Sequence, residues 1–261
     1  MATDAQDSER KYRAPALEKG LDVLELLSAN GAPMTPSQMS AALGRSVSEL
    51  FRMIQVLEFR GYIEQSGGAY SLSNRLFTLG LSRTPIRTLT ELALPQMQAL
   101  AQAVTQSCHL VVPSEDQIVV IARIEAPGDL GFSVRVGYRR ELIEATSGLL
   151  FYGLASAADQ AALHARLQAR FGAQKVKRFA AAAAAAAAAG HAERASDFVH
   201  GVTDLVAPIF GPDGIRATLI IPYIARTPPT APADEVLAGL RAAAAAVSDG
   251  LGAPPRLSSP A

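Results

Sequence analysis

The residues best suited to recognise a partner lie in one predicted helix, which begins after Ser46. Its apolar side chains recur at helical spacing on one face and are Leu50, Met53, Ile54 and Leu57. Because each helical residue advances by about 100°, Ser48, Arg52 and Gln55 share the opposite face. Arginine can pair with guanine through two hydrogen bonds in the DNA major groove, and glutamine can do the same with adenine. The alternative is an ordinary solvated helix face.

Two capping motifs place this helix second in a predicted helix-turn-helix. Thr35-Pro36-Ser37-Gln38 is typical of a helix start, and the short helix that it begins ends at Leu43, before Gly44. Ser46-Val47-Ser48-Glu49 repeats the capping pattern. The second helix of such a pair enters the major groove. We therefore expect DNA contacts from Ser46, Ser48, Arg52, Gln55, Arg45 and, in the N-terminal arm, Arg13.

Glu49 has two interpretations. It could accept a hydrogen bond from cytosine, or it could fold back onto the Ser46 N–H as the third residue of a capping box. The sequence favours the cap.

Farther along, the strand-like segments 62–65 and 70–72 flank a glycine turn, which predicts a small hairpin, or wing.

The charge distribution limits how tightly one such module can bind DNA. The chain has 24 Lys and Arg against 24 Asp and Glu, and residues 35–83 carry five Arg against three Glu, a balance of +2. A module that neutralises few phosphates binds weakly. We therefore expect a homodimer, or a dimer of dimers, on a double-stranded DNA operator, with help from the basic N-terminal arm.

A second chemical site is predicted where Ala145-Thr146-Ser147-Gly148 precedes a helix. Backbone N–H groups at a helix N-terminus and the two hydroxyls can hold a carboxylate, so we expect a small organic acid, aromatic acids included, as effector. The alternative is that one hydroxyl only caps the helix. We expect the ligand to contact Thr146, Ser147, Gly148, His109, Arg123 and Thr218, with Arg135 as a further candidate. For each of the strand residues a purely structural role is the alternative.

Cys108 beside His109 invites a nucleophile-and-base interpretation. Adjacent strand residues point to opposite faces, so the two cannot readily share a proton. One Cys and four scattered His also offer no spacing typical of zinc ligands. We expect no catalysis, no cofactor and no metal.

Composition predicts a globular protein of the cytoplasm. Hydrophobic residues make up 49% of the chain and charged residues 18%, which is enough apolar material for a sizeable core. A single cysteine suits a reducing compartment. The polar start and the absence of a long unbroken apolar run predict neither export nor a membrane span.

The order of predicted elements indicates an α+β protein with a largely antiparallel sheet. Strands are predicted at 109–113, 117–125, 132–136, 202–210 and 215–223, and helices at 148–155, 157–171 and 234–251. Pro95 should kink or split the helix before the first strand, and the ten alanines 180–189 should form a helical connector. The predicted divisions are a mobile arm at 1–16, a winged helix-turn-helix at 17–80, a linker helix at 81–106, an effector-binding domain at 107–253 and a tail at 254–261.

Several segments together resemble one family. They are 16–21, 39–44, 57–63 and 70–72 in the first half, and 119–125, 136–139, 145–148, 190–192, 201–202 and 207–209 in the second. In type and order they resemble the isocitrate lyase regulator (IclR) family of bacterial transcription factors. The resemblance implies a winged helix-turn-helix, a linker helix and a GAF-like effector domain, assembled as dimers or dimers of dimers, without catalysis.

Two other functions stay open at this point. One is a winged-helix protein-interaction module fused to a small-molecule enzyme domain, although no convergent nucleophile, base and orienting group is evident. The other is a winged helix that binds protein instead of DNA, which its small positive charge permits.

Overall fold

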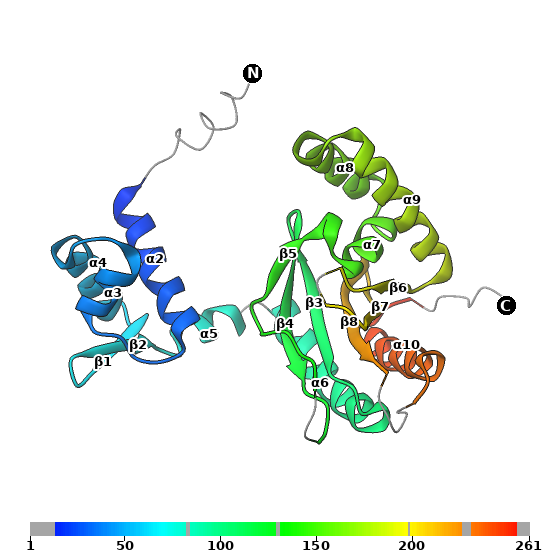
Figure 1. The fold of residues 1–261 in the computed structure, drawn as a ribbon, viewed down its shortest axis with the longest axis horizontal. Coiled ribbons are helices and arrows are strands. Elements are labelled where there is room, and N and C mark those ends of the chain that lie inside the picture. The colour runs from blue at the N-terminus through cyan, green and yellow to red at the C-terminus, as the bar shows by residue number, and fades with distance from the viewer. Residues whose placement is uncertain (1–13, 82–83, 129–130, 198, 226–230, 255–261) are drawn as a thin grey trace. The chain divides into compact units, whose positions relative to one another are not determined.

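The computed structural model describes residues 14–81, 84–128, 131–197, 199–225 and 231–254, and the chain divides into two units, 1–86 and 87–261 (Figure 1). Arg13 and the rest of the predicted arm up to it lie outside the described residues, as do residues 255–261 of the predicted tail.

The first unit is a helix-turn-helix followed by a hairpin. Its elements are α2 (Pro15–Asn30), α3 (Pro36–Leu43), α4 (Val47–Phe59), β1 (Ile63–Ser66), β2 (Ala69–Leu72) and α5 (Arg75–Leu81). Both predicted capping boxes are present, at Thr35 and at Ser46, and Gly44 ends α3 in the left-handed conformation that glycine adopts without strain. The turn chemistry predicted from the sequence is therefore confirmed.

A single core holds α2, α3, α4 and the hairpin together. It is built from Val23, Leu27, Met34, Met39, Leu50, Ile54, Ile63 and Tyr70. β1 and β2 pair antiparallel, and a further bridge between Met34 and Tyr70 ties the hairpin to the segment between α2 and α3. The wing is thus anchored to the same core that orients α4.

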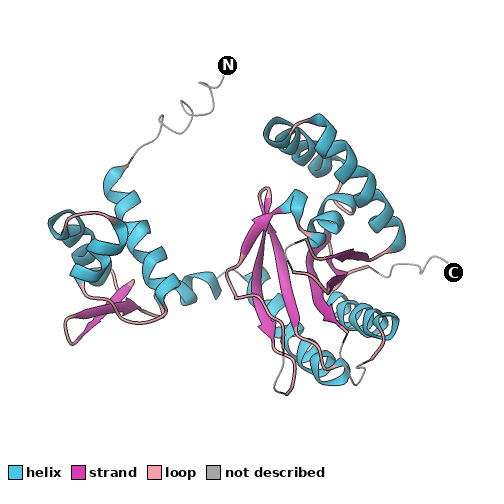
Figure 2. Ribbon diagram, viewed as in Figure 1, coloured by secondary structure: helices cyan, strands magenta, loops and turns pink. Residues whose placement is uncertain are grey.

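The second unit is a six-stranded antiparallel sheet with helices on both faces (Figure 2). The strands are β3 (Cys108–Ser114), β4 (Gln117–Ile124), β5 (Arg139–Glu141), β6 (Ala192–Ala195), β7 (Val202–Gly211) and β8 (Gly214–Ile224), in the spatial order β5-β4-β3-β8-β7-β6. The helices are α6 (Thr84–Val104), η1 (Leu142–Glu144), α7 (Thr146–Gly153), α8 (Ala157–Phe171), α9 (Ala173–Ala189) and α10 (Ala233–Gly250). The predicted α+β class is confirmed.

Strand alternation gives the sheet two separate cores. Leu205, Ala207 and Ile209 of β7 point toward α6 and α10, whereas Val206 points toward α7, α8 and α9. Successive side chains of a strand face opposite ways, so a strand covered on both sides is apolar at nearly every position. The same alternation separates Cys108, which lies in the first core, from His109, which faces the second.

Two sequence expectations about these elements need correction, and two strands were missed. Residues 132–136 form no strand. Side chains bind both backbone groups of Val134: its N–H donates to His109 Nε2 at 3.0 Å, and its carbonyl accepts from Arg123 at 3.4 Å. Pro95 does not split its helix, which runs from 84 to 104 with the proline on the solvent-facing side. The two short strands β5 and β6 were not predicted.

The predicted linker helix also differs in its packing. Residues 75–81 form α5 and residues 84–104 form α6, and α6 contributes Leu89, Ala93 and Met97 to the core that it shares with α10 and the sheet. Most of α6 is therefore part of the second unit. The alanine run lies within α9, where Ala183 and Ala186 are buried, so that prediction of helix is confirmed.

Candidate DNA-reading helix and effector pocket

The rotation of α4 about its own axis is set by its buried side chains. Leu50 is 0% and Ile54 1% exposed, whereas Ser48, Arg52 and Gln55 are all exposed. The three polar side chains therefore lie on the helix face that does not meet the core. Phe59, four residues after Gln55 on the same face, is 89% exposed, a feature that the polar pattern used in sequence reasoning did not mark.

The start of α4 is held by a local network of hydrogen bonds. The Ser46 N–H donates to Glu49 Oε2 at 3.0 Å, and the Glu49 N–H donates to Ser46 Oγ at 3.3 Å. Lys19 of α2 donates to Glu49 Oε1 at 3.0 Å. This bond from Lys19, followed by the one from the Ser46 N–H, lowers the pKa of Glu49 to about 2. The capping interpretation of Glu49 is confirmed.

Two of the predicted DNA-contacting side chains, Ser46 and Arg45, are engaged in contacts within the protein. The Ser46 hydroxyl serves the cap, and it also lies 3.1 Å from the hydroxyl of Ser48. Arg45 donates to Asp22 Oδ2 of α2 at 2.9 Å, so its guanidinium holds α2 to the turn. Arg52 and Gln55 are thus left as the exposed polar side chains with the greatest reach on this face.

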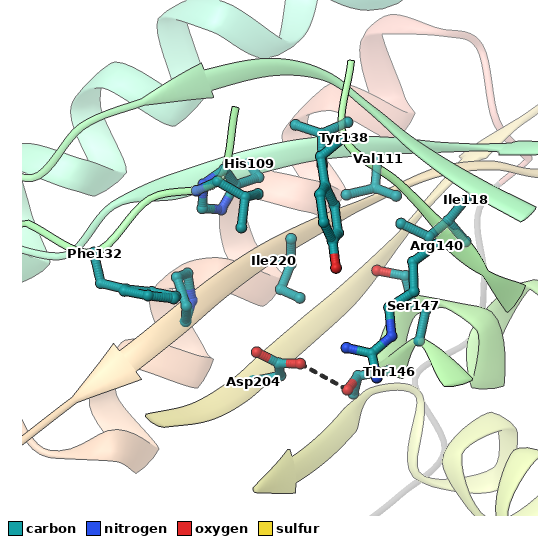
Figure 3. A pocket seen from close by; sticks show the side chains of 14 residues that line it. His109, Val111, Ile118, Phe132, Tyr138, Arg140, Thr146, Ser147, Asp204 and Ile220 are labelled. Atoms are coloured by element: carbon teal, nitrogen blue, oxygen red, sulfur yellow. Dashed lines mark hydrogen bonds between the residues drawn. The ribbon is translucent and has the colours of Figure 1, made fainter. Parts of the chain in front are cut away.

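The second candidate site is a pocket on the α7 side of the sheet (Figure 3). Its volume is about 60 Å³. Aliphatic and aromatic side chains make up most of its wall, together with a few polar groups: His109, Val111, Ile118, Val120, Phe132, Val134, Tyr138, Arg140, Ala145, Thr146, Ser147, Asp204, Ile220 and Pro222. Phe132, Val134 and Tyr138 come from the segment between β4 and β5. A mostly apolar cavity with a few convergent polar groups is typical of a small-molecule site.

The polar end of this pocket gathers Thr146, Asp204 and Arg140 (Figure 3). Thr146 Oγ1 donates to Asp204 Oδ2 at 2.8 Å. Arg140 donates from Nη2 to both carboxylate oxygens of Asp197, at 2.7 and 2.6 Å. Burial raises the pKa of Asp204, against the opposing effects of the Thr146 hydrogen bond and of Arg194 and Arg140.

His109 lines the other part of the pocket and is 1% exposed. Its Nε2 accepts the Val134 N–H at 3.0 Å and lies 3.1 Å from Ser133 Oγ, so this nitrogen carries no proton. Burial, with a smaller contribution from the charge of Arg123, lowers the pKa of His109 to about 4. The imidazole is therefore neutral at pH 7 and holds the covering segment through a backbone hydrogen bond.

The structure brings only some of the predicted ligand contacts together. Thr146, Ser147 and His109 line the pocket, whereas Arg123, Thr218 and Gly148 do not. Thr218 instead donates to Ser147 Oγ at 3.0 Å, beneath the pocket wall, and Arg123 forms an ion pair with Glu125 at 2.8 Å.

Gly148 has a packing role. A Cβ at this position would lie 1.8 Å from the carbonyl oxygen of Leu142, so only glycine lets α7 approach η1 this closely. The close packing of α7 against η1 fixes the positions of Thr146 and Ser147 at the start of the helix. Sequence reasoning placed Gly148 in the ligand site, but its contact is with the protein.

Sequence reasoning missed Arg140, Asp204 and Tyr138. Arg140 and Asp204 lie on strands at different positions in the sheet, β5 and β7, and no spacing in the chain signals that they meet. The only local signal is a charged residue, Asp204, inside a strand that is otherwise mostly apolar.

The described residues were also compared with the requirements of a metal site and of a membrane-spanning helix. No three His, Cys, Asp or Glu side chains among them gather as ligands for a metal ion. None of the helices in the described part of the chain has the length and apolar content needed to cross a membrane.

The buried neutral histidine predicts an acid-sensitive stability. As pH falls from about 6.5 toward 4, the unfolded chain binds a proton at His109 that the folded chain does not, so the folded state loses stability. We expect the wild type to lose roughly 2–3 kcal/mol more unfolding free energy than His109→Gln between pH 7 and 4.5. Urea titrations at the two pH values measure this difference, and equal losses in both proteins would contradict it.

Comparison with known proteins agrees with this geometry. The family model described as the IclR helix-turn-helix domain matches residues 16–67, and the model of the bacterial transcriptional regulator IclR C-terminal domain matches residues 81–249. HTH-type transcriptional regulator KdgR of Escherichia coli (strain K12) is 31% identical over 114 residues, which covers 43% of each chain. The match thus spans less than half the length of KdgR.

Other matches cover nearly the whole chain. The glycerol operon regulatory protein of Streptomyces griseus is 26% identical over 254 residues, which covers 91% of this chain and 96% of that protein. An IclR homolog of Microbacterium hydrocarbonoxydans, solved in complex with 4-hydroxybenzoate, has the same fold, with a TM-score of 0.75 at 19% identity over 91% of this chain and 99% of its own. The two matching models together cover most of the sequence, so this chain belongs to the IclR family of bacterial transcription regulators and not to a family of enzymes.

Proposed function

We propose that this protein is a transcription regulator that binds a double-stranded DNA operator through α4 and responds to a small organic acid in the pocket beside α7. The observation that carries the proposal is the orientation of α4, whose buried Leu50 and Ile54 leave Arg52 and Gln55 exposed on the opposite face. Family membership supports the same role. The family model of the second unit includes every residue that lines the pocket.

DNA reading is assigned to three side chains of α4. Arg52 pairs with guanine O6 and N7, Gln55 with adenine N6 and N7, and Ser48 contacts the backbone or a base edge near the start of the helix. The balance of +2 over residues 35–83 supplies little phosphate attraction, so operator binding needs two modules. The working form is therefore a homodimer or a dimer of dimers that presents two copies of α4 to one operator.

The effector is assigned to the class of small organic acids. Its carboxylate lies at the N-terminal end of α7, near Thr146, Ser147 and Arg140, and its carbon skeleton lies against Phe132 and Ile220. The pocket of about 60 Å³ is smaller than the roughly 150 Å³ cavity known to hold benzene. We infer that residues 132–138 move outward to admit an aromatic acid.

That movement offers a route for regulation. Phe132, Val134 and Tyr138 cover the pocket, and the Val134 backbone is hydrogen-bonded to His109. A ligand that binds better to one arrangement of this segment shifts the population toward it. The effect on DNA affinity is then a coupling between the two sites, of either sign.

The DNA assignment is tested with Arg52→Ala. On a DNA fragment that the wild type selects from a random-sequence library, losing a bidentate guanine pair should weaken binding by about 5- to 150-fold, which corresponds to roughly 1–3 kcal/mol. Arg178→Ala removes the same charge from an exposed position of α9 and should leave affinity within twofold. Fluorescence anisotropy measures both.

Two results of that experiment would count against the assignment. If Arg52→Ala bound the selected DNA as tightly as Arg178→Ala, α4 would not read bases through this arginine. If the wild type retained DNA with no dependence on salt concentration, phosphate contacts would be absent and the protein-interaction alternative would be favoured, because only phosphate contacts release counterions.

The effector assignment is tested by thermal shift with pyruvate, benzoate and 4-hydroxybenzoate. A ligand that binds only the folded state contributes about 2.7 kcal/mol at 100 times its Kd, which corresponds to a rise in Tm of about 5–10 °C. Ser147→Ala should reduce the shift, and Ser156→Ala, at the N-cap of α8 outside this pocket, should not. Equal shifts in both variants would remove Ser147 from the site, and no shift with any of the acids would contradict the effector class.

A further inference from the structure

Asp204 places a carboxyl group in the pocket that we assign to an organic-acid ligand. It lies on β7 and lines the pocket beside Thr146 and Arg140, at the end where the carboxylate of an organic acid is expected (Figure 3). Its Oδ2 accepts the Thr146 hydroxyl at 2.8 Å. A ligand carboxylate that reaches the same hydroxyl and the same arginine therefore comes to lie against the carboxyl group of Asp204.

The cations around Asp204 are already balanced by anions. Arg140 of β5 makes two hydrogen bonds to Asp197, and Arg194 of β6, opposite Asp204 in the sheet, donates to the backbone carbonyl of Glu144. Arg140 and Arg194 together carry two positive charges, and Asp197 and Asp204 together carry two negative charges when both are ionised.

The remaining charged groups nearby do not change this balance. Glu144 is paired with Lys175 at 2.9 Å and Arg123 with Glu125 at 2.8 Å, and His109 of β3 is neutral above about pH 4. A bound anion would therefore leave this partly buried end of the pocket with a net charge of −1. Two carboxylates that share such a site do not both stay ionised, because like charges at short range raise the pKa of one of them.

We propose that effector binding is linked to the uptake of one proton by Asp204. This inference rests on the proposed effector function. One proton from solvent is added to Asp204 Oδ1, the oxygen that does not accept from Thr146, and the resulting O–H donates to a carboxylate oxygen of the ligand. No covalent bond of the ligand forms or breaks. The burial that raises the pKa of Asp204 in the free protein acts in the same direction.

This linkage makes the regulator respond to pH as well as to the acid. Above the pKa of Asp204 in the free protein, and below its pKa in the complex, the Kd should rise by about tenfold for each pH unit. Replacing Asp204 with asparagine supplies a permanent N–H donor to the ligand and keeps an oxygen for Thr146. Asp204→Asn should therefore bind the acid tightly at every pH.

The test is isothermal titration of the 261-residue chain with benzoate and with pyruvate at pH 5.5 and 8.0, in pairs of buffers that differ in ionisation enthalpy. Both probes stay ionised in this range, because a free carboxyl group has a pKa of about 4. We expect the wild type to bind at least tenfold more weakly at pH 8.0 and to take up between half and one proton. Asp204→Asn should differ less than twofold between the two pH values and take up none.

Asp213→Asn is the matched control. Asp213 lies in the turn between β7 and β8, is paired with Arg216, and does not line this pocket. Asp213→Asn should show the same pH dependence of Kd and the same proton uptake as the wild type.

Acid binding without pH dependence or proton uptake in the wild type would overturn the inference and leave the proposed function standing. Loss of acid binding in Asp204→Asn at both pH values would also overturn it, since Asp204 would then be needed as a charged acceptor. If none of the three proteins bound either acid at either pH, the proposed effector class would fail first, and the inference with it.

Discussion

The burial of Leu50 and Ile54 is the constraint on which the proposed DNA-reading surface of α4 depends. These two side chains reach the core of the first unit from one face of α4, and their near-complete removal from solvent fixes the rotation of the helix. Turning α4 by one residue would bring polar groups into that core, at a cost of several kcal/mol for each unpaired group. The exposure of Arg52 and Gln55 is thus a consequence of packing on the opposite side.

In the second unit, the corresponding constraint is the close contact of α7 with η1. Gly148 brings the helix against the Leu142 carbonyl, and this contact positions Thr146 beside Asp204. Strand alternation supplies the other half of the site, because it turns His109 toward the pocket and Cys108 away from it. The packing of α7 and the alternation of β3 together bring the start of α7, the neutral His109 and the carboxyl group of Asp204 to the same cavity.

The parts of the fold that the sequence predicts best are those set by short-range chemistry. The capping boxes at Thr35 and Ser46 depend on residues three positions apart, and the apolar face of α4 depends on helical spacing, so both are evident in the chain alone. The segment 132–136 shows the limit of such patterns. Its alternation suggests a strand, but His109 and Arg123, more than ten residues earlier, bind the backbone that a strand would have used.

The pocket was only partly predictable, because it also depends on contacts between residues that are far apart in the chain. Thr146 and Ser147 are the first residues of α7 and could be selected by their position at a predicted helix start. Arg140 and Asp204 lie on β5 and β7, which are not neighbours in the sheet, and they line the same pocket only in the folded protein. Arg123 was selected for its charge, yet it pairs with Glu125. Charge and spacing identified candidate residues, and the order of the strands decided which of them line the pocket.

In the proposed complex with DNA, α4 lies in the major groove with Arg52 against base edges. Methylation interference on a wild-type-selected operator tests it most directly, because methylation at guanine N7 blocks the acceptor that an arginine uses in that groove. We expect that N7 methylation at one or two guanines in each half-site prevents binding by the wild type, and that methylation at these positions has no effect on binding by Arg52→Ala. Interference confined to the minor groove, or an unchanged pattern in the variant, would contradict it.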